Sequence, residues 1–175
     1  EIQFEDIKNG MKEFQILHTL DHPCISKAIG IDISEQIKDD KGEDITTIAL
    51  FLEFNDFLLK DCLSKEIINN TLKTRIVVEI SHGLRYIHSK HMIYRDLKID
   101  NIMLNSIFEV KLIDFGLIKV NEILFGEETM SNITMTKCVG LDVFMSPEMI
   151  NEDDYDSKTD VYSFGIVLYF IFFGH

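Results

Sequence analysis

Basic residues are scarce in this chain, whose 175 residues include 17 lysines and arginines against 30 aspartates and glutamates, for a formal net charge of −13. Proteins that bind nucleic acids hold the phosphate backbone through clustered lysine and arginine side chains. The composition therefore argues against a nucleic-acid-binding surface and predicts an acidic, solvated exterior. A hydrophobic content of 46% over this length is sufficient for one sizeable core, so we expect one compact unit.

Cysteines are also few. Cys24, Cys62 and Cys138 are far apart and form no C-x-x-C pair, so neither a disulfide framework nor a zinc site is indicated. A reducing intracellular setting, the cytoplasm, fits this pattern best. His88 and His91 form an isolated H-x-x-H, and because no cysteine or carboxylate cluster accompanies them, we expect a structural role for them.

Long apolar runs are lacking as well. The longest, VYSFGIVLYFIFF at 161–173, is interrupted by Ser163 and Gly165 and is shorter than the roughly 18 residues that a membrane span needs. We therefore interpret it as a buried central helix and expect no membrane span. The chain starts at Glu1 without a charged and then apolar leader, which favours a segment of a longer protein over a signal peptide.

Apolar periodicity switches between helical and strand spacing along the chain and predicts an α+β fold. Residues from about Glu5 to Thr19 fit an amphipathic helix, and a second helix is predicted from Asn70, capped by Asn70 or Thr71. Two β-branched segments, CISKAIGIDI and ITTIALFLEF, are separated by KDDKGED and predict a β-hairpin. Short strands are expected near 92–94, 102–104 and 110–113.

Polar residues recur between the last three of these strands, in YRDLKIDN at 94–101 and LIDFG at 112–116. Side chains presented on loops beside strands are well placed for binding and reaction. A carboxylate, an ammonium and an amide within a few residues suggest a site for a highly charged ligand, with phosphate and magnesium as the obvious candidate.

These motifs resemble those of eukaryotic protein kinases. YRDLKIDN is similar to the catalytic loop H-R-D-L-x-x-x-N, DFG at 114–116 to the metal-binding motif that follows it, and SPE at 146–148 to A-P-E. Lys98 after Arg-Asp-Leu resembles the serine/threonine type, and DVYSFG at 160–165 resembles its tyrosine-kinase-like group. The resemblance implies part of a bilobal α+β fold, with 1–54 from the small lobe and 55–175 from the first half of the large lobe.

The resemblance also implies roles for the polar residues of the two motifs. Asp96 would accept or orient the proton of the substrate hydroxyl, and Lys98 would reach the transferring phosphate. Asn101 and Asp114 would hold magnesium. ATP and Mg²⁺ are thus the implied cofactors, and serine or threonine hydroxyls of a protein substrate are the implied acceptors in a signalling role.

A second group of residues would bind the nucleotide. Leu52 falls at the position that gates the adenine pocket, and Glu53 to Asn55 would offer backbone hydrogen bonds to the base. Met103 would form the pocket floor. Glu13 would pair with a lysine on an earlier strand, and we expect that lysine and the glycine-rich loop to precede Glu1, just as we expect later helices to follow the chain.

Other positions bear on regulation and activity. Between DFG and SPE lies a segment that resembles an activation loop, and Arg95 and Lys119 match positions that bind a phosphate on it. Its candidate hydroxyl residues are Thr129, Ser131, Thr134 and Thr136. Leu141 stands where serine/threonine kinases usually have a threonine that hydrogen-bonds the catalytic aspartate and lysine, and Tyr94 replaces the usual histidine, so its hydroxyl needs a partner.

Asp160 has two structural interpretations. The stretch SKTD at 157–160 has the S-x-x-D pattern of a capping box ahead of the apolar helix, whereas the resemblance implies that Asp160 braces the backbone of the catalytic loop. Two functions stay open for the whole protein. One is an ATP-dependent protein kinase, and the other is a pseudokinase, a binding or scaffold module that keeps the fold without transfer chemistry.

Overall fold

The computed structural model describes residues 2–38, 44–120, 143–151 and 153–174. Several predictions concern residues outside these ranges: the candidate hydroxyls between 129 and 136, the thiol of Cys138 and the side chain of Leu141.

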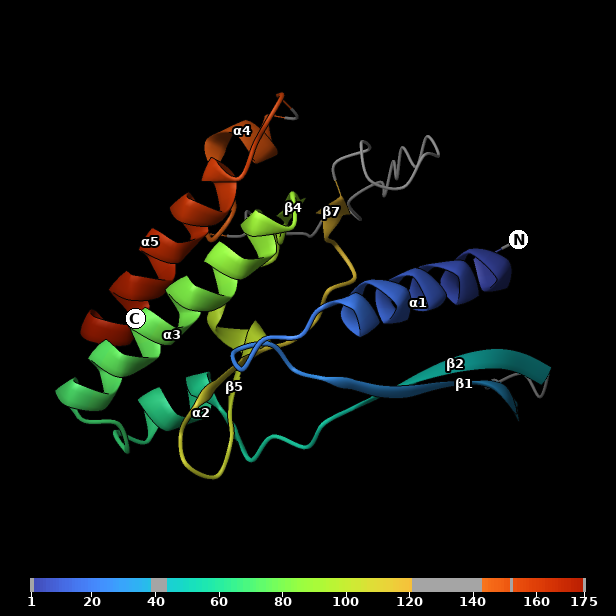
Figure 1. The fold of residues 1–175 in the computed structure, drawn as a ribbon, viewed down its shortest axis with the longest axis horizontal. Coiled ribbons are helices and arrows are strands. Elements are labelled where there is room, and N and C mark those ends of the chain that lie inside the picture. Colours follow the sequence, from blue (N-terminus) through green and yellow to red (C-terminus); the bar gives the residue numbers. More distant parts are fainter. Residues whose placement is uncertain (1, 39–43, 121–142, 152, 175) are drawn as a thin grey trace.

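The first part of the chain forms a helix beside a two-stranded ribbon. Helix α1 spans Ile2–Thr19, three residues longer at its start than predicted. Strands β1 (Ala28–Lys38) and β2 (Asp44–Leu52) pair antiparallel, which confirms the predicted hairpin, although β1 begins four residues later than the apolar pattern indicated. Figure 1 shows α1 running alongside this ribbon.

The second part consists of helices with short strands between them. Strands β3, β5 and β6 form one small antiparallel sheet, and β4 pairs with β7. The three strands predicted near 92, 102 and 110 are confirmed. The elements are β3 (Phe57–Leu58), α2 (Leu59–Ser64), α3 (Asn70–Ser89), β4 (Met92–Ile93), the 3₁₀ helix η1 (Ile99–Asn101), β5 (Ile102–Leu104), β6 (Val110–Leu112), β7 (Lys119–Val120), α4 (Pro147–Ile150) and α5 (Lys158–Phe173).

Helix α3 begins where the sequence predicted, but its cap is one residue earlier. The side chain of Asn69 accepts a hydrogen bond from the backbone N–H of Leu72 at 2.9 Å, which satisfies one of the free donors at the helix start. The prediction of Asn70 or Thr71 as the cap was therefore wrong by one position.

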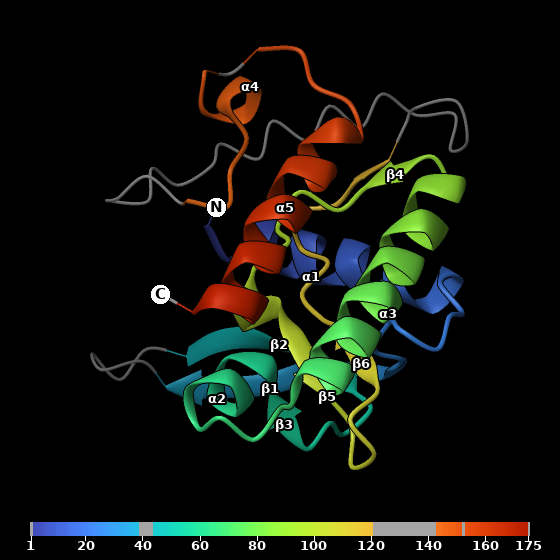
Figure 2. The ribbon, with the colours of Figure 1, turned by 90° about the vertical axis from the view of Figure 1, so that its left-hand side faces the viewer.

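Helix α5 lies beside α3 in Figure 2 and is buried on one face only. Val167 and Ile171 are fully buried, whereas Val161, Tyr169 and Phe173 are exposed. The prediction of a buried helix thus holds for one face of α5. Among the described helices, none combines the length and apolar character that crossing a membrane requires.

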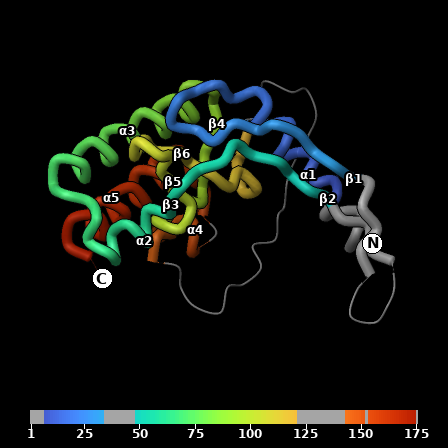
Figure 3. Tube along the Cα trace, turned by 90° about the horizontal axis from the view of Figure 1, so that it is seen from below, coloured from blue at the N-terminus to red at the C-terminus, as the bar shows by residue number. Residues whose placement is uncertain are grey.

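Among the described residues, one hydrophobic core joins the two parts of the chain. It includes Leu17 from α1, Leu84 from α3 and Leu112 from β6. Backbone hydrogen bonds reinforce this junction, because Ser26 N–H donates to the Leu112 carbonyl at 2.9 Å and Leu112 N–H donates to the Cys24 carbonyl at 2.8 Å. Figure 3 shows α1 with the β1–β2 ribbon at one end of the molecule and α2, α3 and α5 at the other. The junction therefore holds residues 94–116 close to α1.

Candidate active site

The loop between β4 and β5 brings three predicted site residues together. The ammonium of Lys98 donates to both carboxylate oxygens of Asp96, at 2.9 and 2.8 Å. The amide nitrogen of Asn101 donates to the Asp96 side chain at 2.6 Å and to its backbone carbonyl at 3.0 Å. Because Asn101 lies in the short helix η1, its amide points back across the loop, and Asp96 is fixed from two sides.

The carboxyl group of Asp96 has a perturbed acidity. Burial raises its pKa above the ordinary aspartate value, and the charge of Asp114 raises it further. Hydrogen bonds and charge from Lys98, together with the amide of Asn101, lower it in part. Opposing influences of this kind are frequent where a carboxylate exchanges protons.

Asp160 supports the backbone of this loop from α5. Its fully buried carboxylate accepts from the backbone N–H groups of Tyr94 at 2.9 Å and Arg95 at 2.8 Å. His88 Nε2 lies 2.7 Å from the same carboxylate, which gives this histidine the structural role expected for it. Ser157 makes no capping hydrogen bond, so the capping-box interpretation was wrong, and Asp160 acts on the catalytic loop instead.

The DFG segment is tied to the loop and to α1. Asp114 has a left-handed backbone conformation, with φ 61°, and its side chain accepts from Gly116 N–H at 3.3 Å. Phe115 is buried against the ring of Tyr94, with the ring centroids 5.1 Å apart. The Tyr94 hydroxyl donates to the carbonyl of Ile113, which supplies the partner that replacing histidine by tyrosine requires.

Glu13 reaches this segment from α1. Its carboxylate accepts a hydrogen bond from Phe115 N–H at 3.1 Å. Burial raises the pKa of Glu13, the Phe115 hydrogen bond opposes the rise, and the charge of Asp114 adds to it. The structure therefore brings Glu13 close to Asp114, whose charge raises the pKa of both Glu13 and Asp96.

Of the predicted adenine-binding residues, Leu52, Glu53 and Asn55 lie at and just after the end of β2. The backbone N–H of Glu53 donates to the carbonyl of Lys27 at 2.9 Å. The backbone carbonyl of Glu53 accepts from the side-chain amide of Asn55 at 3.1 Å. Asn55 is buried, and its amide oxygen has no partner among the described residues. Leu52 and Met103 are half-buried, with Met103 on the sheet strand β5. Their part in binding a base stays a prediction.

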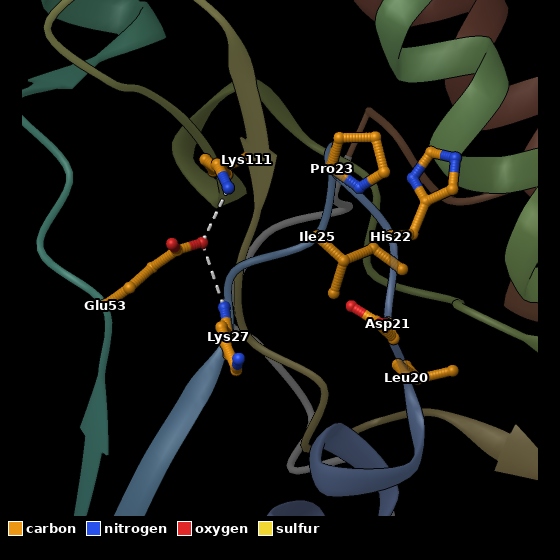
Figure 4. Close-up of a pocket in the computed structure, with 8 residues that line it drawn as sticks. All are labelled: Leu20, Asp21, His22, Pro23, Ile25, Lys27, Glu53 and Lys111. Atoms are coloured by element: carbon orange, nitrogen blue, oxygen red, sulfur yellow. Dashed lines mark hydrogen bonds and ion pairs between the residues drawn. The ribbon is translucent and has the colours of Figure 1, made fainter.

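The Glu53 side chain holds two partners, Lys111 and the backbone of Lys27 (Figure 4). One carboxylate oxygen lies 2.8 Å from the ammonium of Lys111 and accepts from the N–H of Lys27 at 3.0 Å. These residues line a small cavity of about 140 Å³, together with Leu20, Asp21, His22, Pro23 and Ile25. The cavity includes Glu53 but none of the catalytic-loop residues, so it is distinct from the cluster around Asp96.

Sequence reasoning missed two side chains at the site. Lys111 was detectable as a single charge within the buried strand VKLI, three residues before Asp114. Tyr155, whose hydroxyl lies 2.7 Å from the Arg95 guanidinium, carries no such signal, because it lies in an acidic stretch without regular structure.

Comparison with known proteins identifies the class that this fold and site define. The chain belongs to the protein kinase family, because the sequence model described as protein kinase domain matches residues 1–175. The mixed α/β content agrees with part of a kinase-like bilobal fold. The division at residues 54 and 55 stays a prediction.

Its relatives include several serine/threonine kinases. The probable serine/threonine-protein kinase kinX of Dictyostelium discoideum is 31% identical over 90% of this chain and 13% of its own length. Mitogen-activated protein kinase 5 of Arabidopsis thaliana is 30% identical over 93% of this chain and 40% of its own length. The serine/threonine-protein kinase SKM1 of Saccharomyces cerevisiae is 41% identical over 58% of this chain and 14% of its own length. The chain thus spans well under half of each relative, and the names give no support to the pseudokinase alternative.

Proposed function

We propose that the whole protein is an ATP-dependent serine/threonine protein kinase. The observation that carries the proposal is the cluster of Asp96, Lys98 and Asn101, in which one carboxylate is held by an ammonium at 2.8 Å and an amide at 2.6 Å. Phosphoryl transfer depends on positioning and charge neutralisation, and this cluster provides a proton acceptor and a cation in contact.

Each side chain has a defined part in the reaction. The substrate hydroxyl oxygen bonds to the γ-phosphorus of ATP while the bond from phosphorus to the bridging oxygen of ADP breaks, and the hydroxyl proton passes to Asp96. Burial raises the pKa of Asp96, which makes its carboxylate a better proton acceptor than an ordinary aspartate. Lys98, already on this carboxylate, offers its positive charge to the transferred phosphate.

Asn101 and Asp114 are suitable ligands for magnesium. Mg²⁺ prefers oxygen ligands and is usually held by one or two carboxylates with phosphate oxygens of the substrate. Asn101 uses its amide nitrogen for Asp96, which leaves the amide oxygen for a cation. Asp114 raises the pKa of both Asp96 and Glu13, so negative charge accumulates around it as expected at a cation site. Magnesium bound with ATP would neutralise phosphate charge there.

A cytoplasmic signalling role is part of the same proposal. Cys24 and Cys62 are free, buried thiols, which is the usual state in a reducing compartment. Burial raises the pKa of the Cys24 thiol to about 11, which keeps it protonated and unreactive. Regulation by phosphorylation between residues 129 and 136 would act through Arg95 and Lys119.

The test is the variant Asp96→Asn in the full-length protein, assayed with labelled ATP and a general protein substrate. We expect a loss of phosphate transfer of about 10²–10⁴-fold, because a positioned proton acceptor contributes about that factor. ATP binding, measured separately by calorimetry, should be retained.

The matched control is Asp100→Asn. Asp100 lies in the same loop, but its carboxylate is exposed and pairs with the exposed Lys60, an interaction that contributes little in water. We expect near-normal activity from this variant. A wild-type protein that binds ATP and transfers no phosphate would overturn the kinase proposal in favour of a pseudokinase.

A further inference from the structure

Arg95 is held in an unusual backbone conformation. Its φ is 70°, in the left-handed region that arginine rarely adopts and that persists only when the surroundings enforce it. The backbone N–H of Arg95 donates to the buried carboxylate of Asp160 at 2.8 Å. Because Asp96 is the next residue, the conformation of Arg95 sets the direction from which the Asp96 side chain leaves the backbone.

The guanidinium of Arg95 is fixed by neutral oxygen atoms. Its Nε donates to the carbonyl of Leu117, just after the DFG motif, and its Nη1 donates to the hydroxyl of Tyr155 at 2.7 Å. Within the described part of the chain, no carboxylate lies at ion-pair distance from this guanidinium, although acidic residues outnumber basic ones. The phenol hydroxyl thus takes the place that an acidic partner would have.

Tyr155 is itself held from a second side. The ammonium of Lys119 lies 4.6 Å from the centre of the Tyr155 ring, a distance at which a cation is attracted to an aromatic face. Lys12 on α1 is close enough to Arg95 for their charges to repel, since burial and the charges of Arg95 and Lys8 lower the pKa of Lys12. Tyr155 therefore contacts two cations, Arg95 through its hydroxyl and Lys119 through its ring, without adding negative charge.

We propose that Tyr155 is a positioning residue of the catalytic loop, whose hydroxyl holds the Arg95 guanidinium and thereby fixes Asp96. This inference rests on the proposed kinase function. Without the hydroxyl, Nη1 loses its acceptor and the guanidinium is held by the Leu117 carbonyl alone, while the repulsion from Lys12 remains, so the loop is less well fixed. Misplacing a catalytic group by a fraction of an ångström lowers the rate of the chemical step. Nucleotide binding depends on other residues and is unaffected.

The test is Tyr155→Phe in the full-length kinase, because phenylalanine keeps the ring that Lys119 contacts and removes only the hydroxyl. We expect kcat to fall about tenfold, in line with the loss of one hydrogen bond to a charged group. The KM for ATP should stay at the wild-type value, and the melting temperature should fall by about 4 °C or less, because the lost hydrogen bond also stabilises the folded state. Tyr162→Phe is the control, because Tyr162 is an exposed tyrosine on α5, and it should leave kcat unchanged.

A double-mutant cycle separates positioning through Arg95 from a general structural effect. If Tyr155 acts through Arg95, adding Tyr155→Phe to Arg95→Met should cause no further loss of kcat. An equal tenfold loss in both backgrounds would overturn the proposal, as would an unchanged kcat in the single variant.

A readout that does not need activity distinguishes failure of this inference from failure of the proposed function. Amide hydrogen exchange in residues 94–98 should become faster in Tyr155→Phe than in Tyr162→Phe, because the loop is held less firmly. Unchanged exchange in these residues overturns the role of Tyr155 even in a wild-type protein without transferase activity. Absence of wild-type activity by itself contradicts only the kinase proposal.

Discussion

The catalytic loop, residues 94–101, and the hinge, residues 52–55, hold their polar groups in different ways. In the loop, the side chains proposed to carry the chemistry bond to one another, and Asp160, more than 60 residues beyond Tyr94 and Arg95, braces the backbone. In the hinge, backbone groups would contact the ligand, and the Glu53 side chain is used to anchor the segment to Lys27 and Lys111.

This difference decides what a sequence can reveal about each region. The proposed reaction requires particular side chains at Asp96, Lys98 and Asn101, so these residues form a motif. A hinge needs only a backbone of the right shape, which many side chains can support. Lys111, which anchors the hinge through Glu53, is consequently not part of a recognisable motif, although it lies close to DFG in the sequence.

The largest effect is expected from removing the brace of the loop. Asp160→Ala leaves the N–H groups of Tyr94 and Arg95 and the ring of His88 without their acceptor. Unsatisfied donors next to a buried site are costly, so we expect the free energy of unfolding to fall by roughly 3–5 kcal/mol. Chemical denaturation of the full-length protein measures this change. Asp154→Ala, at an exposed position before α5, should alter it by less than about 0.5 kcal/mol. A loss from Asp160→Ala as small as that of the control would show that the loop does not depend on its brace.

The second prediction concerns the chemistry of the loop. Lys98→Ala should reduce phosphate transfer by about 10²–10³-fold, because it removes a cation placed at the reacting phosphate. The hydrogen bonds and charge of Lys98 lower the pKa of Asp96, so without Lys98 this pKa rises. A proton acceptor works only when it is deprotonated. If its pKa rises, it becomes protonated at a higher pH as the solution is acidified, so the acidic limb of the kcat/KM profile should shift to higher pH. Lys60→Ala, which removes the partner of Asp100, is the control and should leave the profile unchanged. A downward shift for Lys98→Ala would exclude direct coupling between the two side chains.

The sequence was sufficient for most of the fold. The periodicities that predict α1, α3, α5 and the β1–β2 hairpin reflect burial, and burial determined where these elements formed. The cap of α3 was misplaced because Asn69 and Asn70 are equally good caps, and only the helix path selects Asn69. Asp160 was ambiguous because a capping pattern depends on local spacing alone, whereas its actual partners come from another element.

The candidate site was less completely predictable, because sequence patterns report local spacing and not contacts between distant elements. Motif residues such as Asp96 and Asn101 are found together as expected, because they are close in sequence and one loop determines their geometry. The contacts of Tyr155 with Arg95 and of Lys111 with Glu53 join residues 60 and 58 positions apart. No spacing rule links such pairs, so they become visible only once the packing is known.

The third prediction tests the hinge. Lys111→Met removes the ion pair with Glu53, in which Lys111 is largely buried, and keeps the apolar stem of the side chain. The hinge should become less well fixed, so we expect the KM for ATP to rise about fivefold, equivalent to about 1 kcal/mol, with kcat unchanged. Lys27→Met is a matched control, since Lys27 contacts Glu53 through its backbone N–H, which the substitution keeps. A fall in kcat with constant KM would mean that Lys111 supports the catalytic loop, and the contrast between the two regions would fail.

The smallest effect is expected at Glu13, which lies on α1 but belongs electrostatically with the loop. Burial raises the pKa of Glu13, the hydrogen bond from Phe115 N–H opposes this, and the charge of Asp114 raises it further. A raised pKa means that ionised Glu13 disfavours the folded state. Its stabilising contribution is therefore complete below the unfolded pKa of about 4.3 and is lost as the pH rises through the folded pKa.

Glu13→Gln removes this charge and keeps an oxygen that can accept from Phe115 N–H. We expect a slightly higher melting temperature than wild type at pH 7, by about 2 °C or less, and a difference that shrinks as the pH falls toward the unfolded pKa of about 4.3. Glu66→Gln, at an exposed position, should give no difference at either pH. A lower melting temperature for Glu13→Gln at pH 7 would show that the charge of Glu13 is already compensated within the protein. A higher one would mean that no cation of the protein compensates the charge of Glu13, in contrast to Asp96 and Glu53, whose charges are paired with Lys98 and Lys111 within the fold.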